Sequence, residues 1–74
     1  MLSFIIRLQV DVYSFGVLLC EMSTRKLPDP EKRDDQVAMV TNHALLTLVQ
    51  RCLHQDPQDR PSMEDIIGEL EKLV

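Results

Sequence analysis

The chain has 74 residues, of which 45% are hydrophobic and 27% charged, and its net charge at pH 7 is −4. This composition is typical of folded globular proteins, and the acidic balance gives no electrostatic reason to bind nucleic acid or an anionic membrane. A single core in a chain of this size rarely supplies more than ~3–5 kcal/mol, so we expect weak stability without neighbouring structure.

The cysteines and histidines predict neither a disulfide framework nor a metal site. Cys20 and Cys52 each lie within an apolar run, which favours two buried, reduced thiols over a disulfide between them. His43 and His54 lie eleven positions apart, and neither belongs to a cluster of further ligands. We therefore expect no zinc site.

Residues 1–10 are predicted to form an irregular N-terminal segment that leans toward β structure. The apolar run Leu2–Ile6 is too short to span a bilayer, and Arg7 and Gln9 interrupt its extension. The segment also lacks the basic region and longer apolar run of a signal peptide. We therefore expect no membrane segment and a cytoplasmic location.

Residues 11–23 are predicted to form a helix that is apolar on almost every side. Its apolar positions follow a spacing of three and four, and smaller residues widen the stripe: Val12, Phe15, Leu18, Leu19 and Met22, then Gly16, Val17 and Cys20. Asp11 is the candidate N-cap. Because every face of such a helix needs a partner, it is expected to be buried inside a larger protein.

A proline-containing loop follows over Thr24–Arg33. Pro28 and Pro30 fix φ and remove amide donors, so no long helix can continue through this stretch. Its acidic side chains, and those of the charged stretch that follows it, are expected to be solvated. Residues 36–40 are predicted to form one short helical turn.

Two amphipathic helices complete the predicted all-α fold. The first covers residues 43–55, with Asn42 as its N-cap and Asp56-Pro57 as its end, because the residue before proline avoids the helical region. The second covers residues 62–73, where Ser62 and Asp65 approximate a capping box. Their predicted buried faces are Leu45, Leu46, Leu48, Val49, Cys52 and Leu53 in the first helix and Met63, Ile66, Ile67, Leu70, Leu73 and Val74 in the second.

Two segments, in this order, resemble the large C-terminal lobe of eukaryotic protein kinases. D-V-Y-S-F-G-V-L-L-C-E-M (Asp11 to Met22) resembles its central helix, and R-C-L-H-Q-D-P-Q-D-R-P-S-M (Arg51 to Met63) resembles the stretch that joins two later helices. The resemblance implies that residues 11–74 form a partial kinase C-lobe, with residues 1–10 as a non-family segment. The D-V-Y-S-F-G sequence of the first segment favours the tyrosine kinase or tyrosine-kinase-like groups.

The specificity of the parent kinase for Tyr or for Ser/Thr stays open at the sequence level. Leu53 stands where many tyrosine kinases carry Trp, and Met63 stands where many carry Phe.

The resemblance assigns a structural motif rather than a catalytic one. Its members are Asp11, Phe15, Gly16, Asp56, Pro57, Arg60 and Pro61. In the family, the residue matching Asp11 accepts hydrogen bonds from the catalytic loop, and the residue matching Arg60 pairs with the Glu of an A-P-E motif. The chain contains no A-P-E, so we expect Arg60 to turn to water, Glu64 or Asp59, since an unpaired buried guanidinium is costly.

Kinases transfer the γ-phosphate of ATP to protein hydroxyls with a Gly-rich loop, a strand Lys, an H-R-D and a D-F-G. None of these occurs in the 74 residues. We therefore expect no catalytic, cofactor-binding or metal-binding residues, no bound ATP or magnesium, and no activity of this chain alone.

The alternative is a non-catalytic interaction module that docks on a kinase or a chaperone through exposed apolar helix faces. In both readings the expected partner is protein: the remainder of a kinase domain, or a chaperone. A small helical bundle of unrelated function is a third reading.

Overall fold

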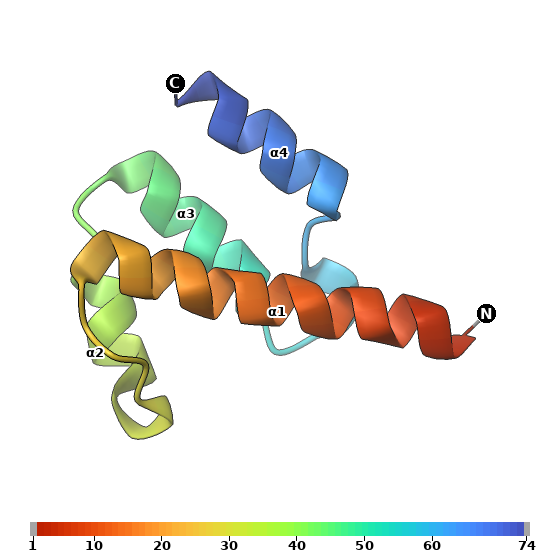
Figure 1. Ribbon diagram of the computed structural model, residues 1–74, viewed down its shortest axis with the longest axis horizontal. Coiled ribbons are helices and arrows are strands. Elements are labelled where there is room, and N and C mark those ends of the chain that lie inside the picture. Colours follow the sequence, from red (N-terminus) through yellow and green to blue (C-terminus); the bar gives the residue numbers. More distant parts are fainter. Residues whose placement is uncertain (1, 74) are drawn as a thin grey trace.

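The structure is a computed structural model that describes the backbone of residues 2–73 and the side chains of residues 8–73. All regular elements in this range are helical: α1 (Leu2–Thr24), η1 (Pro30–Lys32), α2 (Arg33–Ala38), α3 (His43–Cys52), η2 (Pro57–Asp59) and α4 (Met63–Lys72), where η marks a 3-10 turn (Figure 1). The predicted all-α class and its three main helices are therefore confirmed.

Helix α1 begins at Leu2, nine residues before the predicted start at Asp11. The irregular N-terminal segment is thus wrong as a description of residues 2–10, and Met1 lies outside the described residues. The physical reason is that neither Gly nor Pro occurs before Gly16. Once the apolar segment from Asp11 has formed a helix, adding turns at its N-terminus costs little, since extension is easier than nucleation.

The core lies where α1 crosses α3, with α2 against the C-terminal end of α1 (Figure 1). The buried apolar residues are Val12, Leu19 and Cys20 of α1, Val37 and Val40 in and after α2, Leu48, Val49 and Cys52 of α3, and Ile66 of α4. A Cβ placed on Gly16 would lie 2.6 Å from the Cβ of Cys52 and 3.2 Å from a methyl of Leu53. The two helices can therefore approach this closely only because residue 16 has no side chain.

The predicted caps of the two later helices are confirmed. The Asn42 side chain accepts a hydrogen bond from the Leu45 amide at 3.1 Å at the start of α3. Ser62 and Asp65 form a complete capping box, in which the Ser62 Oγ accepts from the Asp65 amide at 3.1 Å and Asp65 Oδ2 accepts from the Ser62 amide at 3.3 Å. Each cap satisfies amides that lack partners within the helix.

The proline-containing loop is held by a side chain that the sequence did not single out. Gln36 donates from Nε2 to the Leu27 carbonyl at 2.8 Å and accepts from the Asp29 amide at 3.2 Å. Asp29 in turn caps η1 by accepting from the Glu31 amide at 3.0 Å, so its carboxylate has a structural role beyond solvation. The short turn predicted at residues 36–40 is helix α2, which begins earlier, at Arg33.

The predicted buried face of α4 is mostly exposed. Ile66 is fully buried and Leu70 packs against the core, but Ile67 is 52% exposed and Met63 and Leu73 are also open to solvent. Val74 lies outside the described residues. Leu18 and Met22 of α1 are exposed as well. Helix α4 is amphipathic as predicted, but the described residues supply too little apolar surface to cover its apolar face and that of α1.

The close approach at Gly16 leads to a first prediction about stability. Replacing Gly16 with Ala should lower the free energy of unfolding by about 1–3 kcal/mol, because the added methyl overlaps Cys52 across the helix crossing. Gly68→Ala is the matched control, since a Cβ there meets no atom within 4 Å. It should raise stability by up to about 1 kcal/mol through helix propensity.

Urea unfolding followed by circular dichroism measures both variants. Equal effects of the two substitutions would contradict the close helix crossing.

Candidate functional site

The family motif around Asp56 forms a tight turn between α3 and α4, here called the motif turn (residues 54–61). Asp56 Oδ1 accepts a hydrogen bond from the Gln58 amide at 2.9 Å, and Pro57 occupies the first position of η2. The Asp56 carbonyl accepts from the Asp59 amide at 3.0 Å. Pro61 is buried, whereas Asp56 and Pro57 are exposed. Helix α3 ends at Cys52, before the predicted end at residue 55, and Asp56 therefore caps η2 rather than stopping α3 directly.

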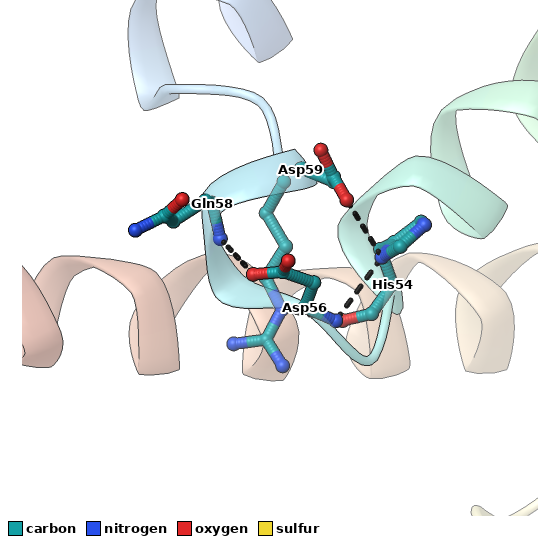
Figure 2. Close-up of polar contacts among 5 residues, drawn as sticks. His54, Asp56, Gln58 and Asp59 are labelled. Carbon is teal, nitrogen blue, oxygen red and sulfur yellow. Dashed lines mark hydrogen bonds and ion pairs between the residues drawn. The ribbon is translucent and has the colours of Figure 1, made fainter.

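His54 closes the motif turn on its α3 side, as Figure 2 shows. Its Nδ1 accepts a hydrogen bond from the Asp56 amide at 3.1 Å. The same nitrogen lies 3.7 Å from Asp59 Oδ2, so one ring atom faces both a donor and a carboxylate. Both side chains are about half exposed, at 49% for His54 and 59% for Asp59.

Arg60 joins the motif turn to α1. Its Nε donates to the His54 carbonyl at 2.8 Å, and its Nη1 donates to the Gln9 carbonyl of α1 at 3.0 Å, 51 positions away in the sequence. The guanidinium carbon also lies 5.0 Å from the centre of the Tyr13 ring, which is within the range of a cation–π contact. The expected ion pair of Arg60 with Glu64 or Asp59 is wrong, because the guanidinium contacts two backbone carbonyls and an aromatic ring instead.

The members of the family motif on α1 lie at different depths. Gly16 is buried at the crossing with α3, and Phe15 packs partly buried against the core. Asp11 is exposed and lies inside α1 rather than at its start, so the predicted N-cap is wrong. The amides that an N-cap would satisfy belong to the beginning of the helix at Leu2.

Both cysteines are free and buried, as predicted. Burial raises the pKa of the Cys20 thiol, an effect that nearby Arg33 partly offsets. Burial likewise raises the pKa of the Cys52 thiol, with Arg51 acting in the opposite direction. Thiols held in the neutral form are poor nucleophiles and poor metal ligands, so neither cysteine is a candidate for chemistry.

The described part of the chain contains no cluster of three or more His, Cys, Asp or Glu side chains that could hold a metal ion. Among the helices from residue 2 to residue 73, none combines the length and the hydropathy that crossing a membrane requires.

The structure brings together only part of the predicted motif. Asp56, Pro57, Arg60 and Pro61 form one turn that contacts α1, while Asp11 is an exposed residue of α1. Three further participants, Gln9, Tyr13 and His54, were not predicted for this contact. Nothing in the sequence alone signals them, because their roles depend on how α1 lies against the motif turn.

A family model described as protein tyrosine and serine/threonine kinase matches residues 2–70. The chain belongs to the protein kinase family. The matched range includes residues 2–10, and α1 crosses the domain boundary predicted at residue 11 without a break. The assignment of residues 1–10 to a separate non-family segment stays a prediction.

The curated relatives are named as kinases of several specificities. The chain is 33% identical, over 88% of its length, to a probable serine/threonine-protein kinase of Dictyostelium discoideum, of which the match covers 8%. It is 34% identical, over 86% of its length, to a serine/threonine/tyrosine-protein kinase of Arabidopsis thaliana, of which 20% is covered. A dual specificity kinase of D. discoideum is 32% identical over 86% of the chain, which spans 15% of that relative.

The kinase segment thus spans a fifth or less of the length of these curated relatives. No solved structure gives a significant match to the chain.

The contact of Arg60 with α1 leads to a second prediction. Arg60→Lys should lower the free energy of unfolding by about 1–2 kcal/mol, because an ammonium on a flexible stem cannot donate to two separate carbonyls in the fixed geometry of the guanidinium. The exposed Arg51→Lys serves as a matched control and should change stability by less than about 0.5 kcal/mol. Urea denaturation of the two variants checks this, and equal effects would contradict the bridging role.

Proposed function

We propose that this chain is a helical scaffold segment of a protein kinase C-lobe, in which α1 is the buried axis and the motif turn fixes the later helices against it. The single observation that carries the proposal is the contact that Arg60 makes between the motif turn and α1. These two elements contain all the residues of the family motif. The exposed apolar residues of α1 and α4 support it, since further parts of a lobe would cover them.

We further propose that the intact parent transfers the γ-phosphate of ATP to protein Tyr or Ser/Thr, with ATP and magnesium bound outside these 74 residues. The sequence holds no Gly-rich loop, strand Lys, H-R-D or D-F-G, so the groups that grip nucleotide and magnesium are not among its side chains. The relatives' names include serine/threonine, serine/threonine/tyrosine and dual specificity kinases, which favours the tyrosine-kinase-like group for the parent. A cytoplasmic location is part of the same proposal.

A phosphotransfer assay is the third prediction. The purified 74-residue chain, incubated with radiolabelled ATP, magnesium and both a Ser/Thr and a Tyr substrate, should incorporate no phosphate above the enzyme-free blank. An active kinase in parallel reactions shows that the assay works. Magnesium-dependent incorporation that co-purifies with the chain through two different columns would contradict the proposal.

The second candidate function is a non-catalytic interaction module whose partner is a kinase or a chaperone. The observation that favours it is the exposure of large apolar side chains on helices whose backbones are already formed. They include Leu8, Val10, Leu18 and Met22 of α1 and Met63, Ile67 and Leu73 in and after α4. Exposed apolar surface of this kind drives association when it is contiguous.

The exposed face of α1 leads to a fourth prediction. The chain should bind a hydrophobic dye and self-associate as its concentration rises, and Leu18→Glu should weaken both effects, because it puts a charge where an apolar side chain is 49% exposed. Gln50→Glu adds the same charge at an exposed position of α3, away from the exposed apolar residues of α1 and α4, and should leave both effects unchanged. Light scattering coupled to size-exclusion chromatography measures the association.

A monomer of wild-type chain at all concentrations, with no dye fluorescence, would remove the support for the interaction module. If that monomer also melts cooperatively, the chain folds as an independent unit, and the result would count against the kinase scaffold as well. If the monomer melts without cooperativity, the scaffold proposal is unaffected.

A further inference from the structure

His54 occupies a position where one ring nitrogen has two neighbours with opposite requirements. The Asp56 amide, 3.1 Å from Nδ1, needs an acceptor, and that requires Nδ1 to be unprotonated. The Asp59 carboxylate, with Oδ2 3.7 Å from the same nitrogen, can only accept, and a hydrogen bond to it requires Nδ1 to carry a proton. Figure 2 shows both lines meeting at this atom.

We propose that His54 is a proton-operated switch of the motif turn. In the neutral state Nδ1 accepts from the Asp56 amide, so the remaining proton lies on Nε2. On protonation Nδ1 becomes a donor, the Asp56 amide loses its acceptor, and the ring turns to donate to Asp59 Oδ2. The proton comes from solvent, since the side chain is 49% exposed. Histidine is the side chain whose charge changes between about pH 5 and pH 8.

The charged groups around the ring come from the elements on each side of it. From η2 they are the carboxylates of Asp56, which is engaged with the Gln58 amide, and of Asp59. On the α3 side the contact is between backbone groups, since the Arg51 carbonyl accepts from the His54 amide at 3.3 Å. Arg60 follows η2 and contacts the His54 carbonyl. Asp59 is the carboxylate positioned to receive a proton-bearing Nδ1, because the Asp56 carboxylate already caps η2.

The switch is connected to α1 through Arg60. The guanidinium holds the His54 carbonyl at one end and the Gln9 carbonyl and the Tyr13 ring at the other. Asp59 precedes Arg60 directly, so the hydrogen bond that the turned ring makes with Asp59 shifts the backbone that carries the guanidinium. Protonation of His54 therefore loosens or shifts the contact between the motif turn and α1. This inference does not depend on phosphotransfer or on a partner.

Nuclear magnetic resonance of the isotope-labelled 74-residue chain between pH 8 and pH 5 is the test, and the fifth prediction. The His54 ring nitrogens should show the tautomer with the proton on Nε2 at pH 8. As the ring titrates, the Asp56 amide proton should move upfield, as expected for a lost hydrogen bond. The Arg60 Nε–H and Tyr13 ring signals should follow with the same midpoint.

Two variants separate the switch from other titrations. In His54→Gln these coupled shifts of Asp56, Arg60 and Tyr13 should vanish. In Asp59→Ala the Asp56 amide should still respond, but the response of Arg60 should be lost, because the ring has no carboxylate to turn toward.

Three results would overturn the proposal. The first is a His54 titration that leaves the Asp56 amide unchanged. The second is an unaltered Arg60 response in Asp59→Ala. The third is a wild-type chain without dispersed Asp56 and Arg60 signals at pH 8, which would mean that the turn does not form.

Discussion

The crossing of α1 and α3 at Gly16 is the constraint on which the other contacts depend. The absence of a Cβ lets Cys52 and Leu53 lie against the backbone of α1, which fixes the C-terminal end of α3. The motif turn starts immediately after this end, and only from there can Arg60 reach the Gln9 carbonyl. A wider crossing would therefore move the motif turn away from α1 and uncouple the two halves of the family motif, even if each helix kept its own caps.

The contact of Arg60 shows how the chain accommodates a cation for which it offers no well-placed carboxylate. Hydrogen bonds from a charged donor are worth about 1.5–3 kcal/mol when well formed, but one end of this contact is exposed and is correspondingly weaker. Carbonyl oxygens have two lone pairs, so the carbonyl of Gln9 can accept from Arg60 in addition to its place in the helical ladder. The Tyr13 ring adds attraction without requiring a second charge.

The sequence predicted the elements that local signals define and missed those that depend on distant neighbours. Asn42 and the Ser62–Asp65 pair cap helices by bonds that span three residues, so their patterns suffice. The start of α1 has no such signal, because the polar residue that marked a start, Asp11, lies inside a longer helix. The partners of Arg60 could not be predicted either, since Gln9 becomes available only when α1 extends past Asp11.

The exposure of Ile67 and Leu18 also depends on distant neighbours, because no other part of the described structure covers these two side chains. Helix α4, which carries Ile67, has a complete capping box, and α1, which carries Leu18, runs without a break from Leu2 to Thr24, so the exposed apolar faces do not result from poorly formed local structure. A surface that packs against these faces could bury them without changing any helix, and each buried side chain of this size would add about 1.5–3 kcal/mol. For a chain whose own core rarely supplies more than ~3–5 kcal/mol, such burial is comparable to its whole stability. Both proposed functions, the scaffold and the interaction module, therefore require a second apolar surface that packs against α1 and α4.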